Sequence, residues 1–175
     1  GTSRLGSVDE GTSHLDFEPE EIKRKITIST SIHHCGWKKC YFNLIDTPGD
    51  DSFISDTRLS LQAADGVVVV IDATAGVKVG TEKVWAFADE QGLTRAIFVN
   101  KMDRVGANFW RTIDMIRTRL GSNPIAIQVP IGLEDSFQGA VDLIEQKAWI
   151  FSDQLGAVPE EQPVPEDMLE LIAEK

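Results

Sequence analysis

The chain has 175 residues, 42% hydrophobic and 26% charged, an ordinary balance for a globular protein that argues against wholesale disorder. Its net charge of −11 argues against broad RNA or DNA binding, because phosphate contacts need clustered Lys and Arg. The longest apolar run, residues 67–71, is too short to cross a membrane, and no signal peptide is evident. Two cysteines are too few for a disulfide framework and fit a reducing cytoplasm.

The N-terminal part combines a weakly patterned segment with two short strands. Residues 1–24 are rich in Gly, Ser, Thr and acids, which predicts a mobile loop, and residues 16–24 can form a helix. Two β-branched or aromatic runs follow, over residues 25–34 and 37–46. They predict a hairpin that turns near Cys35-Gly36.

The central part alternates helical and strand patterns. Helices are predicted over residues 50–65, 81–91 and 108–120, and strands over residues 66–72, 95–100 and 124–132. The continuous apolar run of the first of these strands is typical of burial on both faces of a parallel sheet. The alternation predicts an α/β doubly wound, mostly parallel sheet, with its site at the carboxyl ends of the strands.

A first functional motif, Asp-Thr-Pro-Gly, follows the strand that ends at Asp46. A strand-end aspartate can hold Mg²⁺ through its water shell, and the N–H of Gly49 can approach a γ-phosphate because no Cβ intervenes. The same four residues also make a good turn, so both interpretations stay open for this motif alone.

A second motif, Asn-Lys-Met-Asp, follows the strand that ends at Asn100. Asp103 can accept hydrogen bonds from the N1–H and amino groups of guanine, Asn100 can serve the O6/N7 edge, and the Lys101 stem can lie along the base. Adenine would leave the Asp103 oxygens unmatched. The alternative is a helix cap after a strand.

The two motifs together resemble the GTP-binding domain of translational GTPases, specifically elongation factor G and its close paralogues. Both end buried strands in the order and with the separation that a GTPase requires. The similar stretches cover nearly the whole chain: EEIKRKITIST, LIDTPGDDSF, LQAADGVVVVIDATAGV, QGLTRAIFVNKMDR and GAVDLIEQKAWIF.

The resemblance implies a ribosome-associated parent protein that binds GTP or GDP with Mg²⁺ and hydrolyses GTP to drive a step such as translocation. It also implies that Thr27 ligates Mg²⁺ in the GTP-bound state, although a sheet threonine is the alternative. The family usually has glycine where this chain has Lys25, and its loss could restrict the folding of the first switch loop.

The P-loop motif G-x-x-x-x-G-K-[ST] does not occur in the chain. In the family it precedes the first switch region, so the resemblance implies a truncated P-loop GTPase sheet. We expect residues 1–26 to be the switch I-like loop, 27–136 a core without first strand and P-loop, and 137–175 the start of an inserted subdomain with an acidic connector. Such a fragment is expected to bind GTP weakly or not at all, to be inactive alone, and to leave strand edges unpaired.

Asp50 stands where the family usually has a histidine thought to position the attacking water. An ionised carboxylate can accept a hydrogen bond from water but has no proton to donate, which suggests slow or redirected hydrolysis. Alternatively, Asp50 and Asp51 only place charge at the start of the next helix.

Two other functional interpretations stay open: a ribosomal-protection or release-factor relative, and a nucleotide-binding regulatory module with little hydrolysis. A metal site in the stretch HHCGWKKC is disfavoured, because adjacent histidines on a strand face opposite ways and no C-x₂-C spacing occurs.

Overall fold

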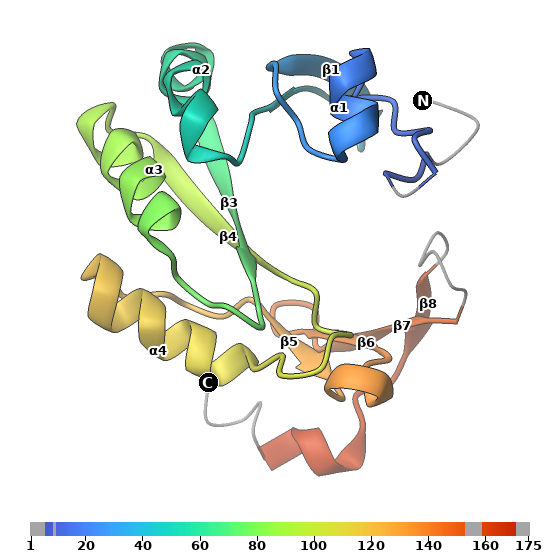
Figure 1. Ribbon diagram of the computed structural model, residues 1–175. Helices are drawn as coiled ribbons and strands as arrows, with labels where there is room; N and C mark the ends of the chain where they lie inside the picture. Colours follow the sequence, from blue (N-terminus) through green and yellow to red (C-terminus); the bar gives the residue numbers. More distant parts are fainter. Residues whose placement is uncertain (1–5, 9, 153–158, 171–175) are drawn as a thin grey trace. The chain divides into compact units, whose positions relative to one another are not determined.

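The computed structural model describes residues 6–8, 10–152 and 159–170 (Figure 1). The chain packs into two compact units, Gly1–Val68 with Val79–Ala96, and Val69–Lys78 with Ile97–Lys175. Across these described segments, no helix has both the length and the apolar character needed to traverse a membrane.

The first unit begins with α1 (Pro19–Arg24), which lies within the segment predicted as loop and possible helix. Proline at its first position and Glu20 and Glu21 in its first turn favour the helix start. Lys25 ends the helix in the left-handed region, with φ 58°.

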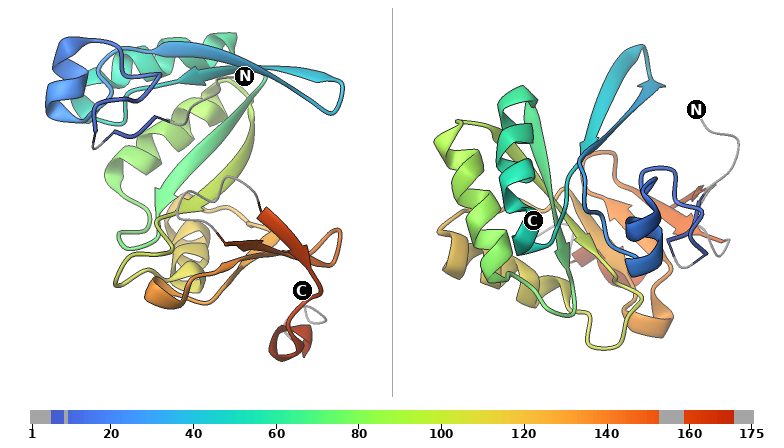
Figure 2. Two further views of the ribbon diagram at one scale, coloured as in Figure 1. Left: turned by 90° about the vertical axis from the view of Figure 1, so that its right-hand side faces the viewer. Right: turned by 45° about the horizontal axis from the view of Figure 1, so that its top comes forward.

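A hairpin of β1 (Ser31–Trp37) and β2 (Cys40–Asp46) follows α1. The strands are antiparallel, and Ser31 lies opposite Asp46. The prediction of a turn near Cys35-Gly36 was wrong, because both residues lie inside β1 and the turn is Lys38-Lys39. Both lysines have positive φ, 43° and 67°, the conformation that suits a two-residue hairpin turn. Figure 2 shows this turn projecting away from the helices of the same unit.

The helical segment predicted after the hairpin is present in three pieces. They are η1 (Asp51–Phe53), α2 (Ile54–Ser60) and η2 (Leu61–Ala63). α3 (Val79–Glu90) lies against α2. Arg58 of α2 forms an ion pair with Glu90 of α3 (2.8 Å), and its guanidinium lies 5.0 Å from the Phe87 ring centroid.

The strands β3 (Gly66–Asp72) and β4 (Thr94–Asn100) are neighbours in one sheet and run in the same direction, with α3 between them in the chain (Figure 1). The expectation that β3 is buried on both faces was wrong: Val69 and Ile71 are buried, whereas Val68 and Val70 are 64% and 59% exposed. Because side chains alternate along a strand, only one face is covered by described residues. Among the described residues, β2 and β3 belong to separate sheets.

The second unit contains α4 (Phe109–Leu120), whose start and end follow the prediction closely. The Asn108 side chain accepts a hydrogen bond from the Arg111 N–H (2.8 Å), and Gly121 ends the helix at φ 62°. Ile113 and Ile116 lie on its buried face.

An antiparallel four-stranded sheet completes the second unit. Its strands lie in the order β5 (Gln128–Ile131), β6 (Gly139–Asp142), β7 (Lys147–Phe151) and β8 (Pro159–Gln162). Two short helices accompany the sheet: η3 (Glu134–Ser136) lies between β5 and β6 in the chain, and η4 (Glu166–Met168) follows β8. Only residues 128–131 of the predicted strand 124–132 are in the sheet. The predicted acidic connector instead contributes β8, and residues 153–158 and 171–175 of it lie outside the described residues.

Candidate guanine-nucleotide site

The carboxyl ends of β3 and β4 place polar residues side by side in the second unit. Asp72 and Asn100 are the last residues of the two strands, and the Ala73 N–H donates to the Asn100 carbonyl (2.9 Å). Beyond Asn100 the chain turns sharply, because Lys101 has φ 61° and its N–H donates to Asn100 Oδ1 (2.8 Å). The predicted motif therefore starts in a fixed, left-handed turn.

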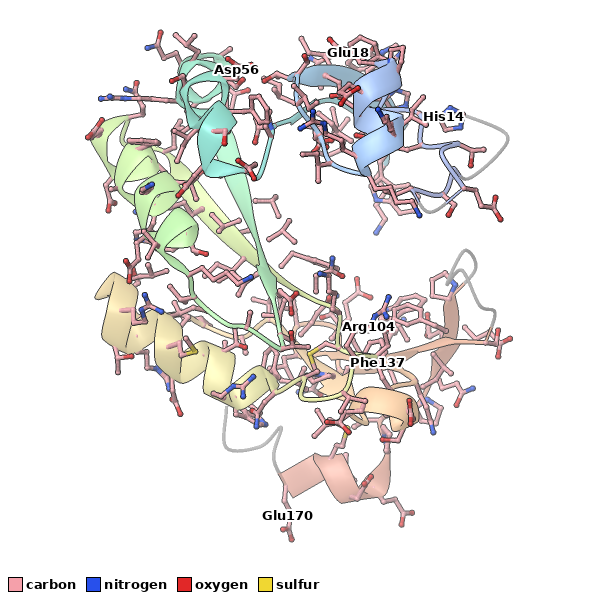
Figure 3. The ribbon with its side chains drawn as sticks, in the orientation of Figure 1. His14, Glu18, Asp56, Arg104, Phe137 and Glu170 are labelled. Atoms are coloured by element: carbon pink, nitrogen blue, oxygen red, sulfur yellow. The ribbon has the colours of Figure 1, made fainter. Side chains whose placement is uncertain are left out.

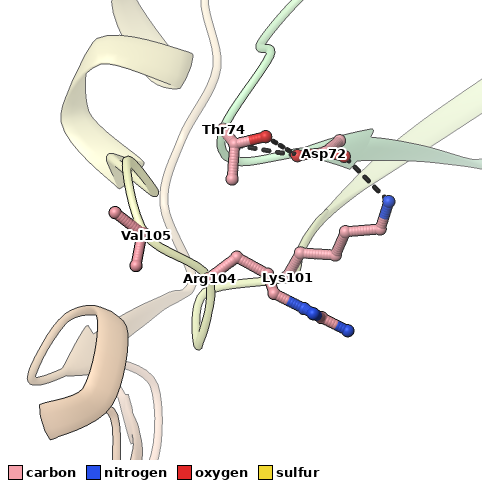
Figure 4. Close-up of a pocket in the computed structure, with 5 residues that line it drawn as sticks. All are labelled: Asp72, Thr74, Lys101, Arg104 and Val105. Atoms are coloured by element: carbon pink, nitrogen blue, oxygen red, sulfur yellow. Dashed lines mark hydrogen bonds and ion pairs between the residues drawn. The ribbon is translucent and has the colours of Figure 1, made fainter.

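The Asp72 carboxylate joins the two strand-end loops (Figure 4). Its Oδ1 accepts from the Thr74 N–H (2.8 Å) and the Thr74 hydroxyl (2.6 Å), and its Oδ2 accepts from Lys101 Nζ (2.9 Å). The bond from the Thr74 hydroxyl, followed by that from Lys101, holds the pKa of Asp72 well below its usual range. Asp72 is therefore a permanent negative charge at neutral pH.

These loops border a shallow, open hollow of about 590 Å³. It is lined by Asp72, Thr74, Lys101, Arg104 and Val105. Asp103 lies in the same loop, with its side chain 65% exposed and one carboxylate oxygen 3.7 Å from Arg104 Nε. Of the three predicted base-contacting residues, Lys101 thus lines the hollow, and Asn100 and Asp103 lie beside it in the chain.

Arg111 of α4 stabilises the frame of the hollow. Its Nη2 donates to the carbonyl oxygens of Ala73 (3.0 Å), Thr74 (2.8 Å) and Gly106 (3.1 Å). Glu134 supports the same frame, since its Oε1 accepts from the Gly106 N–H (2.6 Å). The loops after β3 and β4 are therefore bound to one helix.

The other predicted site residues lie in the first unit. The Thr27 hydroxyl donates to Asp16 Oδ1 (3.0 Å), and Asp16 is buried. Burial raises the pKa of Asp46, and the nearby charges of Asp16 and Glu21 raise it further. The structure thus gathers Thr27 and Asp46 into one strongly acidic region.

Glu21 organises this region, because its fully buried carboxylate accepts four backbone hydrogen bonds. Oε2 accepts from the N–H groups of Phe17 (3.1 Å) and Glu18 (2.9 Å), and Oε1 from those of Ile28 (2.8 Å) and Ser29 (3.0 Å). Burial alone would raise the pKa of Glu21, but these bonds outweigh it and lower the pKa.

Glu18 adds a second connection across the same segment. It precedes α1 (Figure 3), and its Oε1 accepts from the Ser29 hydroxyl (2.9 Å). Residues 25–30, predicted as strand, are therefore tied to α1, since Glu21 accepts from the backbone N–H groups of Ile28 and Ser29.

Gly49 and Asp50 lie just beyond β2. Gly49 is exposed, and a Cβ there would meet no atom within 4 Å. Asp50 Oδ1 accepts from the Ser52 N–H (2.8 Å), and Ser52 lowers the pKa of Asp50. Asp51 forms an ion pair with Lys83 (2.9 Å). Asp50 therefore caps η1, and Asp51 links η1 to α3.

The donor set of the first unit suits a hard cation. Within the described residues, no three His, Cys, Asp or Glu side chains form a metal-binding group. Thr27 and Asp46 nevertheless offer oxygen donors, the type that Mg²⁺ prefers together with water and phosphate. Ser31, opposite Asp46 in the hairpin, has a buried hydroxyl without a hydrogen-bond partner among the described residues. An unsatisfied polar atom beside Asp46 fits a region that binds additional polar groups.

The sequence profile of the elongation factor Tu GTP-binding domain matches residues 2–169. The chain belongs to this family. It is 44% identical over 166 residues to elongation factor G of Thermotoga neapolitana, an alignment that covers 95% of this chain and 24% of that protein. A crystal structure of a protein from Thermus thermophilus superimposes with a TM-score of 0.88 at 30% identity, covering 99% of this chain and 26% of the other. The chain spans about a quarter of the length of each.

Membership of the elongation factor Tu GTP-binding domain family confirms two predictions. The fold class, an α/β GTPase sheet present in part, agrees with both the family and the superposition. The resemblance to translational GTPases agrees with the identity to elongation factor G.

Two residues that hold these regions in place, Asp72 and Glu21, were not predicted from the sequence. Asp72 ends an apolar run just as Asp46 does, so the same strand-end signal could have found it. Glu21 carried no such signal, because an acid in the first turn of a short helix is ordinarily exposed.

Proposed function

We propose that these residues form part of the GTP-binding domain of a longer, cytoplasmic, elongation factor G-like protein. That protein binds GTP and hydrolyses it on the ribosome to drive a conformational step such as translocation. The family, and the 44% identity to elongation factor G of Thermotoga neapolitana over nearly the whole chain, support this proposal. We further propose that residues 137–175 begin the inserted subdomain.

The observation that carries the proposal is the arrangement around Asn100, Lys101 and Asp103. The chain takes a left-handed turn at Lys101, directly after β4, and Lys101 lines the open hollow there. Asp103 then accepts from the guanine N1–H and amino groups, Asn100 serves the O6/N7 edge, and Lys101 covers the face of the base.

The first unit supplies the phosphate-sensing part. We assign Mg²⁺ to Thr27 and Asp46, and the γ-phosphate to the N–H of Gly49; the ion neutralises phosphate charge when bound. The raised pKa of Asp46 supports this assignment, since a carboxylate among buried acids gains most from a cation. The Thr27 hydroxyl donates to Asp16, and its oxygen lone pairs would remain available to the ion.

Asp50 supports a second candidate, a nucleotide-binding regulatory module with little hydrolysis. Its carboxylate caps η1 through Ser52 and offers no proton toward a γ-phosphate. GTP turnover by the full-length protein with and without ribosomes separates the candidates: stimulated turnover identifies an enzyme, and unchanged turnover identifies the module.

Nucleotide choice tests the guanine site directly. In the full-length protein, Asp103→Asn should weaken GDP binding by about 100-fold or more, because the amide cannot accept both guanine donors. The same variant should gain affinity for xanthosine diphosphate, whose C2 carbonyl accepts from the new amide. Asp135→Asn, an exposed carboxylate of the same unit, is the matched control. Unchanged GDP affinity in Asp103→Asn would contradict the assignment.

A further inference from the structure

Asp72 lies outside the Asn-Lys-Met-Asp motif, yet its carboxylate holds the motif's lysine. The ammonium of Lys101 donates to Asp72 Oδ2 (2.9 Å), although the two residues are 29 positions apart in the chain. The other oxygen of Asp72 is held by Thr74 through two hydrogen bonds. The carboxylate is thus fixed in orientation before it meets the lysine.

Lys101 is fixed at both ends. Its backbone is held in the left-handed region, where its N–H donates to Asn100 Oδ1 (2.8 Å), and its side-chain end is held by Asp72. The methylene stem between these points lines the hollow. A lysine side chain otherwise samples many rotamers, and the conformational entropy lost on ordering it would weaken ligand binding.

We propose that Asp72 is a positioning residue for base recognition: it holds Lys101 extended along the wall of the hollow, so that the apolar stem of the lysine is in place before a guanine base arrives. This inference rests on the proposed function of the Asn100–Asp103 loop. It also assigns the lysine ammonium to Asp72 rather than to a phosphate.

A simpler role for Asp72 is to stabilise its own loop through Thr74. The two roles are separable because different carboxylate oxygens carry them. In Asp72→Asn the amide oxygen can still accept from Thr74, whereas the amide NH₂ cannot pair with an ammonium. In Lys101→Met the stem is kept and the ammonium is removed.

The test is a double-mutant cycle in the full-length protein, with a fluorescent GDP analogue as the probe. Asp72→Asn should raise the dissociation constant about 3- to 10-fold, a modest factor because the Lys101 side chain is half exposed. Lys101→Met should produce a similar loss. Asp72→Asn should then cause no further loss in the Lys101→Met background.

The outcomes distinguish the alternatives. Equal losses from Asp72→Asn in both backgrounds, or no loss in either, would overturn the positioning role. Asp135→Asn, an exposed carboxylate of the same unit with no bond to Asp72 or Lys101 among the described residues, is the control; its effect should be the same in both backgrounds. If Asp72→Asn fails to fold, Lys101→Met decides alone, since unchanged affinity there refutes anchoring. Failure of the unaltered protein to bind GDP would refute the proposed function itself.

Discussion

Replacement of Glu21 by glutamine is the sharpest test of how the N-terminal segment is held. The carboxylate accepts two N–H groups on each oxygen and is fully buried. A glutamine fits the same space but presents one oxygen and one NH₂ group. Two backbone N–H groups would then face another donor instead of an acceptor.

The magnitude follows from the two lost hydrogen bonds. Bonds to a charged group contribute roughly 1.5–3 kcal/mol each. Losing two should therefore destabilise the segment around α1 by on the order of 3 kcal/mol, which corresponds to about 100-fold faster hydrogen exchange at the amides of Ile28 and Ser29. Glu20→Gln is the control on the same helix: it breaks only an exposed pair with Arg24 and should cost a few tenths of a kcal/mol.

The pH dependence has a defined sign. Because the folded pKa of Glu21 is lowered, its contribution is fully present above the unfolded pKa, roughly pH 4, and is lost as the pH falls through the folded value. The difference between the unaltered protein and Glu21→Gln should thus be constant from pH 6 to 8 and shrink in acid. Exchange rates at Ile28 and Ser29 that match those of the Glu20→Gln control would refute this account.

Two further predictions concern backbone strain and hydrolysis. Gly132→Ala should lower the unfolding free energy by more than Gly92→Ala. Both positions have φ above 60°, with a cost of roughly 1–2 kcal/mol, but only at Gly132 would the new Cβ collide with backbone atoms, those of Ser136. Equal losses in chemical denaturation would contradict the packing argument. Asp50→His should raise ribosome-stimulated GTP turnover of the full-length protein several-fold, since a histidine can donate a proton. Asp50→Asn keeps the acceptor for Ser52 and should not raise turnover. An unchanged or lower rate in the histidine variant argues against a brake at this position.

The position of the Asn-Lys-Met-Asp motif at the end of a strand was predictable because its signal is local. Asn100, Lys101 and Asp103 follow one apolar strand, and parallel strands bring their carboxyl ends to a common edge. The partner of the lysine was not predictable, since Asp72 ends another strand and only the pairing of β3 with β4 brings the two together.

Local sequence signals gave wrong predictions where contacts between distant parts of the chain determine the structure. Gly36 suggested a turn, but the strands pair from Ser31 with Asp46 to Trp37 with Cys40, and this register leaves Lys38-Lys39 to make the turn. Residues 25–30 have strand propensity, yet their N–H groups are bound by Glu21 of the preceding helix. Propensity describes isolated segments, whereas a buried carboxylate acts across the chain.

The Arg111 guanidinium couples the position of α4 to the loops that follow β3 and β4. One side chain from the first turn of the helix binds carbonyl groups on the loop after β3 and on the loop after β4. A rotation or shift of the helix by a fraction of an ångström would therefore be transmitted to Thr74 and Gly106 at once. A partner that displaced α4 would therefore displace both loops together.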